Sequence, residues 1–297
     1  MSDWAALLRT LESGLTILPD KPEESAAGTL RALWFAAAGA PRSVELAASG
    51  ELPVLSASQQ AALNAMIDQR LSGTPLNHLT GRQRFLDLEM YAAKGALIPR
   101  KETEIVGRAA LDVIAKLAAE RGEVCVVDVC TGSGNLALAY AAHEPKARVL
   151  AADLSADAIA VARQNTSVLG LDGRVDFRVG DLLAPFGADL DGQVDVLSCN
   201  PPYISSAKVG AMASEISAHE PTLAFDGGPF GIKILSRVIK EGLRLVRPGG
   251  YLCFELGLGQ GPAMAQRVEK SGAYDEVRSF HDAAGETRAI VARVKRP

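Results

Sequence analysis

Residues 124–135 read Val-Cys-Val-Val-Asp-Val-Cys-Thr-Gly-Ser-Gly-Asn, and they decide the fold of the chain. The first six are nearly all apolar, which is typical of a strand buried on both faces of a parallel sheet. The glycines that follow let the backbone approach a ligand closely, and the N-terminus of the next helix offers free N–H groups. These residues therefore predict a strand, turn and helix of an α/β sheet, with a ligand site at the carboxyl end of the strand.

Segments with the patterns of strands and helices alternate through most of the chain. The predicted strands are residues 124–129, 148–153, 175–180, 194–200 and 251–255, followed by β-like segments at 276–280 and 288–294. The predicted helices are residues 101–120, 135–142, 156–169, 232–245 and 262–270. This alternation predicts a doubly wound, mostly parallel sheet with right-handed crossovers. A terminal hairpin would place the final strand antiparallel to the others.

The N-terminal part of the chain has a different pattern. Residues 1–83 predict helices only, and an apolar stripe at helical spacing begins at Trp4. Ser56 is placed to cap a helix over residues 57–71. Alternating apolar and polar residues then predict a β-hairpin linker over residues 84–97. We therefore expect a compact helical bundle, a short linker and an α/β domain.

The composition is that of a globular protein, with 48% hydrophobic and 22% charged residues. No long apolar run predicts a membrane span, and the first residues lack the features of a signal peptide. The cysteines have no Cys-x-x-Cys spacing and lie in or beside apolar runs, which predicts reduced, buried thiols without a metal site and a cytoplasmic protein. The net charge of −4 and the lack of a Lys/Arg-rich run count against nucleic acid as the substrate.

Two acidic positions at predicted strand ends complete a cofactor site. Asp153 ends one strand, where a carboxylate can accept both hydroxyls of a ribose. Asp181 follows the next, where it can accept from an adenine amino group with Leu182 against the ring. The spacing of Gly132 and Gly134 also fits the dinucleotide fingerprint, so the glycines alone allow NAD or S-adenosylmethionine. A dehydrogenase would need a hydride-side acid, which the four histidines do not supply, so the sulfonium cofactor fits better.

Asn200, Pro201, Pro202 and Tyr203 directly follow the apolar run at residues 194–199. Proline fixes φ near −65° and holds the preceding residue extended, so the loop is stiff and its carbonyls remain free. We expect the Asn200 side-chain oxygen and the Pro201 carbonyl to accept the two N–H groups of a planar NH2 group. Tyr203 would pack against the plane of that group. These residues predict methyl transfer to an amide or exocyclic amino nitrogen.

A series of motifs runs along the chain in a fixed order. They are Pro-Leu-Asn-His-Leu-Thr-Gly-Arg at 75–82, Ile-Pro-Arg-Lys-Glu-Thr-Glu at 98–104, Thr-Gly-Ser-Gly at 131–134, Asn-Pro-Pro-Tyr at 200–203, Glu-Pro-Thr-Leu-Ala-Phe-Asp-Gly-Gly at 220–228, Phe-Glu-Leu-Gly at 254–257 and Asp-Ala-Ala-Gly-Glu-Thr-Arg at 282–288. Together they resemble the HemK/PrmC family of protein-(glutamine-N5) methyltransferases, which act on peptide chain release factors. The resemblance extends from about residue 30 to the end.

The resemblance implies a class I S-adenosylmethionine-dependent methyltransferase, with a Rossmann-like, mostly parallel seven-stranded sheet in residues 98–297. Residues 1–83 would then be the helical domain that holds the protein substrate. The implied cofactor-binding residues are Cys130, Thr131, Gly132, Ser133, Gly134, Asp153, Asp181, Leu182 and Asn200. The implied catalytic residues are Asn200, Pro201, Pro202 and Tyr203. We expect a monomer that methylates a release factor glutamine and associates with no membrane.

Two positions depart from the pattern of this family. Cys130 stands where its cofactor loop usually begins with Gly, and Phe230 stands where an acidic residue is common near the substrate. The resemblance also implies that Glu220 and Pro221 lie beside the target pocket. The charges within residues 100–104 fit either a helix N-terminus or a place near the methionine end of the cofactor.

Other targets remain open at this stage. A related family that methylates a glutamine of a ribosomal protein shares the core motifs. Asn-Pro-Pro-Tyr loops also occur in enzymes that methylate the N6 amino group of adenine in a flipped base. Such enzymes call for a basic face, whereas residues 1–83 hold six Lys/Arg and eight Asp/Glu, a net of 6 − 8 = −2. A protein glutamine is therefore the favoured target.

Overall fold

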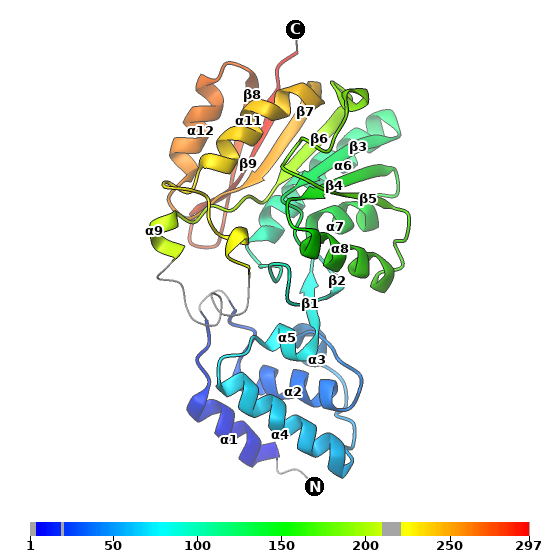
Figure 1. Ribbon diagram of the computed structural model, residues 1–297, viewed down its shortest axis with the longest axis vertical. Coiled ribbons are helices and arrows are strands. Elements are labelled where there is room, and N and C mark those ends of the chain that lie inside the picture. The colour runs from blue at the N-terminus through cyan, green and yellow to red at the C-terminus, as the bar shows by residue number, and fades with distance from the viewer. Residues whose placement is uncertain (1–3, 19–20, 210–220, 297) are drawn as a thin grey trace.

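The computed structural model describes residues 4–18, 21–209 and 221–296 (Figure 1). A small helical unit is built from the N-terminal residues, and a larger α/β unit from the rest (Figure 1). A two-stranded hairpin lies between them. Within the described ranges, no helix is long and apolar enough to cross a membrane.

Within the described chain, seven strands form the sheet of the larger unit, in the order β5-β4-β3-β6-β7-β9-β8. Their bounds are β3 (Val124–Val129), β4 (Ala147–Asp153), β5 (Val175–Val179), β6 (Val194–Cys199), β7 (Val246–Glu255), β8 (Tyr274–His281) and β9 (Thr287–Val294). Strands β3 to β7 are parallel, whereas β9 lies between β7 and β8 and is antiparallel to both. The predicted parallel sheet and antiparallel final strand are therefore confirmed.

Helices cover both faces of this sheet (Figure 1). They are α6 (Thr103–Arg121), α7 (Asn135–His143) and α8 (Ala156–Val168) on one face, and α11 (Lys233–Leu245) and α12 (Gly261–Lys270) on the other, with short turns α9 (Ser206–Val209), η1 (Ala188–Leu190) and η2 (Thr222–Ala224) in the connections. In β3, Val126 packs into the core under α6 and α7, whereas Val127 packs into the core under α11. This alternation explains why the strand is apolar at nearly every position.

The N-terminal helical unit has its own hydrophobic core. Its helices are α1 (Trp4–Gly14), α2 (Ala26–Ala37), α3 (Val44–Ala47), α4 (Ala57–Leu71) and α5 (Leu76–Thr80). Ser56 caps α4 as predicted, and it forms a reciprocal capping box with Gln59. The short helices α3 and α5 were not predicted, because four or five residues do not complete enough turns to show an apolar period.

The hairpin joins the two units through side-chain hydrogen bonds. It consists of β1 (Arg82–Phe85) and β2 (Leu88–Tyr91), and both turn residues have positive φ. Glu89 accepts hydrogen bonds from the backbone N–H and the hydroxyl of Ser43, at 2.5 and 2.6 Å, in the helical unit. On the other side, the Asn165 side chain of α8 accepts from the Tyr91 N–H at 2.6 Å and donates to its carbonyl at 3.1 Å. The hairpin therefore spans residues 82–91, whereas the linker was predicted over residues 84–97, and it contacts both units.

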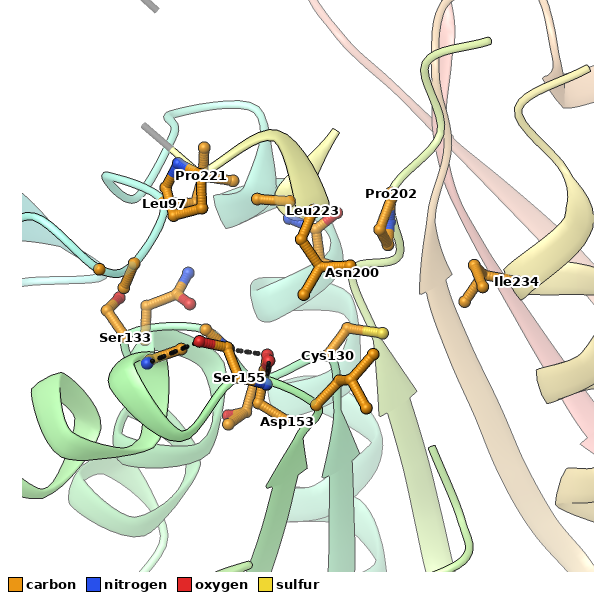
Figure 2. A pocket seen from close by; sticks show the side chains of 18 of the residues that line it. Leu97, Cys130, Ser133, Asp153, Ser155, Asn200, Pro202, Pro221, Leu223 and Ile234 are labelled. Atoms are coloured by element: carbon orange, nitrogen blue, oxygen red, sulfur yellow. Dashed lines mark hydrogen bonds between the residues drawn. The ribbon is translucent and has the colours of Figure 1, made fainter. Parts of the chain in front are cut away.

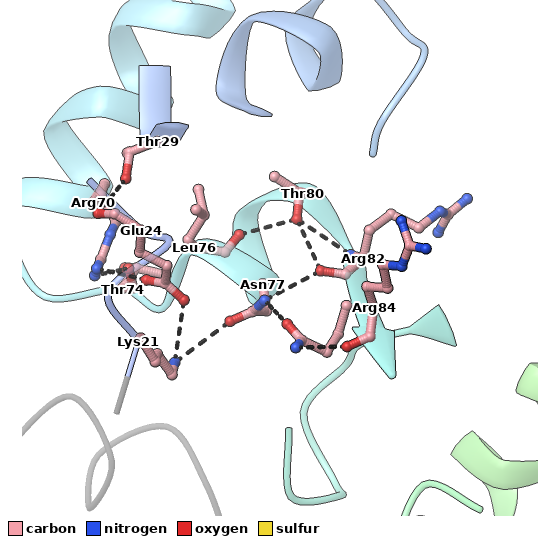
Figure 3. A network of polar contacts seen from close by, with 11 residues as sticks. Lys21, Glu24, Thr29, Arg70, Thr74, Leu76, Asn77, Thr80, Arg82 and Arg84 are labelled. Carbon is pink, nitrogen blue, oxygen red and sulfur yellow. Dashed lines mark hydrogen bonds and ion pairs between the residues drawn. The ribbon is translucent and has the colours of Figure 1, made fainter. Parts of the chain in front are cut away.

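A buried network of charged and amide side chains links the helical unit to the hairpin (Figure 3). The Arg70 guanidinium lies 2.9 Å from the Glu24 carboxylate, and the Lys21 ammonium lies 3.4 Å from it. Lys21 also donates to Asn77 at 3.5 Å, and Asn77 donates to Gln83 on β1. Each buried charge thus faces a group of opposite charge or a polar partner, which offsets part of its desolvation cost.

Candidate active site

A cavity opens at the carboxyl ends of β3, β4 and β6, where an open α/β sheet binds its ligand (Figure 2). Counted with its open mouth, the cavity and the adjoining solvent hold about 990 Å³ of space. Most of the sequence-predicted site residues line it: Cys130, Thr131, Gly132, Ser133, Asp153, Asp181, Leu182, Asn200 and Pro202. Gly134, Pro201 and Tyr203 were also predicted at the site, but they do not line the cavity.

The two glycines of the β3–α7 turn have different physical roles. Gly132 has φ +55°, and a Cβ there would meet nothing within 4 Å, so its backbone faces open space beside the cavity. Gly134 has φ +80°, and a Cβ there would lie 3.0 Å from the Cβ of Ala162 and 3.2 Å from the Phe177 ring. Gly134 therefore permits close packing of α7 against α8 and β5. Cys130 also has a positive φ of 57°, a conformation that the usual Gly adopts without strain.

Asp153 is held in place by the backbone at the end of β4. Its Oδ2 accepts from the Gly132 N–H at 2.8 Å, and its Oδ1 accepts from the Ser155 N–H at 2.9 Å. Burial raises the pKa of Asp153, while these backbone hydrogen bonds act in the opposite direction. The carboxylate is thus fixed in orientation, and each oxygen retains a lone pair for a further donor.

Asp181 and Leu182 follow β5 at the rim of the cavity. The Leu182 side chain is buried and its backbone φ is +48°. The exposed Asp181 carboxylate lies 3.0 Å from the Arg237 guanidinium of α11. A ligand amino group at this point would share the carboxylate with Arg237.

Asn200 lies across the cavity from Asp153 (Figure 2). Its side-chain Nδ2 donates to the Thr103 hydroxyl at the start of α6, at 3.2 Å. The Oδ1 atom is therefore the side-chain atom of Asn200 with acceptor capacity for a ligand. Within the described residues, none donates a hydrogen bond to the carbonyl of Pro201.

Tyr203 lies behind the loop, away from the cavity. Its hydroxyl donates to the Glu255 carboxylate at the end of β7, at 3.0 Å. A Cβ at Gly257 would lie 2.9 Å from the Tyr203 ring, and Gln260 donates to the Tyr203 carbonyl at 3.1 Å. These contacts anchor the loop from below. Tyr203 was expected to pack against a target amide, but its side chain does not line this cavity.

Two buried carboxylates lie close to the cavity and were not singled out from the sequence. Burial raises the pKa of Asp128 to about 7, and the hydrogen bond from the Ser198 hydroxyl acts in the opposite direction. Burial likewise raises the pKa of Glu255 to about 7, opposed chiefly by the Thr103 hydroxyl. Both residues stand within apolar strands, so only their burial in the fold distinguishes them.

Several residues complete the cavity wall without a sequence signal for that role. Apolar contacts come from Leu97, Leu154, Ala158, Leu223 and Ile234, and polar ones from Thr103 and Ser155. Arg100 lines the cavity, whereas Glu102 lies 3.7 Å from Arg288 and Glu104 accepts from the Leu86 N–H at 3.1 Å. Of these charged residues, Arg100 therefore belongs to the cavity wall, whereas Glu102 and Glu104 make contacts elsewhere in the fold. Pro221 also lines the cavity, while Glu220 lies outside the described residues.

Comparisons with known proteins bear on this site. Residues 107–232 match the family model "Methyltransferase small domain". The chain is 39% identical to a release factor glutamine methyltransferase of Moorella thermoacetica over 76% of this chain and 77% of that protein. It is 35% identical to a release factor glutamine methyltransferase of Caulobacter vibrioides, over 82% of this chain and 81% of that protein. A solved structure of human methyltransferase 10 domain containing protein shares the fold, with a TM-score of 0.51 and 15% identity over 70% of this chain and 88% of that one.

Proposed function

The chain belongs to the release factor glutamine methyltransferase family, and we propose that it methylates the side-chain N5 of the glutamine in the Gly-Gly-Gln loop of peptide chain release factors. The observation that carries the proposal is the position of Asn200. It stands at the end of β6, lines the same cavity as the glycine loop and Asp153, and has its side-chain oxygen available as an acceptor.

The cavity residues fit S-adenosylmethionine, the cofactor of this class of enzyme. The Ser133 hydroxyl is buried and has no hydrogen-bond partner among the described residues, so it can bind a polar ligand group. Gly132 leaves room for a ligand against its backbone, and Asp153 is oriented to accept from the ribose hydroxyls. Leu182 supplies an apolar surface for the adenine ring. When bound, S-adenosylmethionine supplies an electrophilic methyl group on its sulfonium.

The residues of the loop act by orienting the target nitrogen. An amide nitrogen is a poor nucleophile because its lone pair is delocalised, and no side chain of ordinary pKa deprotonates it. The Asn200 Oδ1 and the Pro201 carbonyl accept its two N–H groups and stabilise the positive charge that develops there. Alignment of this kind can lower a barrier by roughly 7–11 kcal/mol at its upper end. Pro202 limits the motion of the loop, and Tyr203 holds it from behind.

The N-terminal unit, residues 1–83, supplies the surface that holds the protein substrate. The hairpin and its hydrogen bonds to Ser43 and Asn165 keep this unit at a fixed place relative to the cavity. In the proposed arrangement, a glutamine on a loop of the release factor enters the cavity beside Asn200 while the rest of that protein contacts the helices. In the proposed function, one copy of the chain binds the release factor as a monomer in the cytoplasm.

The test is incubation with methyl-labelled S-adenosylmethionine and a purified release factor. The expected result is label on the glutamine of the Gly-Gly-Gln loop, lost when that glutamine is changed to Ala. Parallel reactions contain ribosomal proteins, DNA or RNA in place of the release factor. Label that persists after the Gln→Ala change, or that appears mainly in a parallel reaction, contradicts the proposed target.

A further inference from the structure

Two arginines of α11 hold the segment that follows β5. The Arg237 guanidinium contacts the Asp181 carboxylate. Arg244, seven residues further along the helix, donates to the Leu183 and Phe186 carbonyls at 3.2 and 3.1 Å. Seven residues correspond to about two helical turns, so the two arginines lie on the same face of α11. The segment that begins with Asp181 is therefore fixed against this helix at two places.

The contact between Arg237 and Asp181 uses both oxygens of the carboxylate. The Arg237 Nη1 donates to Asp181 Oδ1 at 3.1 Å, and its Nη2 lies 3.0 Å from Oδ2. The Arg237 Nε donates to the Glu241 carboxylate at 2.9 Å, one turn further along the helix. A guanidinium is planar, so these contacts on two sides fix its plane, and the paired nitrogens in turn fix the orientation of the Asp181 carboxylate.

Asp181 reaches the cavity, whereas Arg237 lies behind it. Asp181 and Leu182 line the cavity, and so does Ile234 of α11 (Figure 2). Ile234 and Arg237 are three residues apart on this helix, so they lie on the same face. Each carboxylate oxygen has two lone pairs, and Arg237 occupies one on each oxygen. The Asp181 carboxylate can therefore accept a further hydrogen bond from a ligand in the cavity.

We infer that Arg237 is a positioning residue, which holds the Asp181 carboxylate toward the amino group of the adenine ring. It thereby favours an adenine nucleoside over one that lacks this amino group. The inference rests on the cofactor site proposed above, with Asp181 beside the adenine ring. A free aspartate side chain loses rotational freedom when it binds a ligand, whereas one already held by a guanidinium has less to lose. A carboxylate can only accept, so it gains nothing from a ligand without a donor at this point.

The exposure of this ion pair shows that fold stability is not its main consequence. The side chains of Arg237 and Asp181 are 37% and 49% exposed. Exposed ion pairs contribute little to stability, because water and salt screen them. A pair that only supported the fold would also affect all ligands of the cavity alike, whereas a positioning residue affects those with the amino group. A comparison of two ligands therefore tests the inference.

The first experiment measures binding by calorimetry and needs no methyl acceptor. The ligands are S-adenosylhomocysteine and its analogue with purine in place of adenine, which lacks the amino group. Arg237→Met removes the charge and all donors. We expect it to raise the dissociation constant of S-adenosylhomocysteine about threefold to tenfold, the range for one hydrogen bond, and that of the analogue less than about twofold. Arg237→Lys keeps the charge without the paired donors and should give an intermediate value.

The matched control is Lys240→Met, which removes an exposed positive charge from the same helix. Both ligands should bind this variant within about twofold of wild type, because salt screens exposed charges. The thermal midpoint of each variant shows whether it is folded during the titration. An equal loss of affinity for both ligands in Arg237→Met overturns the inference, since it indicates a change in the fold or in the overall charge. Unchanged affinity for both ligands also overturns it.

The second experiment tests whether Arg237 acts through Asp181. Asp181→Ala is prepared alone and together with Arg237→Met, and S-adenosylhomocysteine is titrated into each protein. If Arg237 acts through the carboxylate, its loss has no further effect once the carboxylate is absent. The double variant should then bind within about twofold of Asp181→Ala. Free-energy losses that add in the double variant contradict the positioning role.

These measurements separate the inference from the proposed function. If the release factor glutamine is not methylated but Arg237→Met weakens only the ligand with the amino group, the proposed target is wrong and the positioning role holds. If the glutamine is methylated but the wild-type protein binds both ligands equally, Asp181 does not contact the amino group. The inference is then wrong and the function stands.

Discussion

The helical unit and the active site both bury charged side chains, but they compensate these charges in different ways. In the helical unit, Glu24 lies between the cations of Arg70 and Lys21 (Figure 3). In the active site, Glu255 accepts a hydrogen bond from the neutral Tyr203 hydroxyl, and burial raises its pKa to about 7. Asp128 is in the same state beside Ser198.

This difference separates structural from functional polar groups. The ion pairs of the helical unit are satisfied by groups of the same chain, and they connect α4 to the segment before α2. Around the cavity, the Ser133 hydroxyl has no partner among the described residues, and the Asn200 oxygen can still accept. Polar groups of the active site are thus arranged for a ligand, at some cost to stability.

The largest expected effect comes from breaking the network of the helical unit. Glu24→Ala removes the carboxylate that lies 2.9 Å from the buried Arg70 guanidinium, and removal of one partner of a buried ion pair typically costs about 3–5 kcal/mol. Urea unfolding should show this loss in the free energy of unfolding. Glu12→Ala, an exposed substitution on α1, should cost less than about 0.5 kcal/mol. Similar values for both variants would mean that the network adds little.

Asn200→Ala tests the active site, and we expect it to cause little loss of stability. Removing an oriented hydrogen-bonding group from a catalytic site typically lowers kcat by about 10²–10³. The cofactor dissociation constant should change by less than about fivefold, because the lost contact is made to the target nitrogen. Asn64→Ala, an exposed change on α4, is the control. Wild-type turnover in Asn200→Ala would disprove the assigned role.

Asp153→Ala should act on the cofactor and not on the target. The variant loses a carboxylate that accepts hydrogen bonds from a ribose, which is worth about 1.5–3 kcal/mol, or about tenfold to a hundredfold in affinity. Calorimetry with S-adenosylmethionine measures the change, and the exposed Asp172→Ala serves as control. Unchanged affinity would rule out this contact.

The smallest effect is a dependence of stability on pH that comes from the active site. Burial raises the folded-state pKa values of Asp128 and Glu255 to about 7, from 3.8 and 4.5. At a pH between the ordinary and the raised pKa, the folded state therefore binds more protons than the unfolded state. Their contribution is therefore most favourable below about pH 4 and is lost as the pH rises to about 7. Glu255→Gln should reduce this fall in the free energy of unfolding by on the order of 1–3 kcal/mol.

The exposed substitution Glu269→Gln is the control for this measurement, since its carboxylate lies at the surface of α12. It should leave the slope of stability against pH unchanged. A Glu255→Gln slope equal to that of wild type would show that the buried carboxylate costs nothing when it ionises.

Sequence patterns were sufficient for the order and type of the long elements. The apolar strand β3, the glycine turn after it and the capped helix α4 all follow from local chemistry, because each depends on neighbours along the chain. The loop from Asn200 to Pro202 could also be placed at a strand end. Local patterns failed for α3 and α5, which are too short to show a period.

The sequence by itself predicted a doubly wound sheet, with a glycine loop, Asp153 and Asn200 at the carboxyl ends of its strands. Only the tertiary structure decided how these residues are supported. Thr103 begins α6 and Asn200 follows β6, and no spacing in the chain predicts the hydrogen bond that joins them. Tyr203 was expected to face the target, yet it anchors the loop from behind. Long-range packing decides such contacts, because the direction of a side chain depends on neighbours that are distant in sequence.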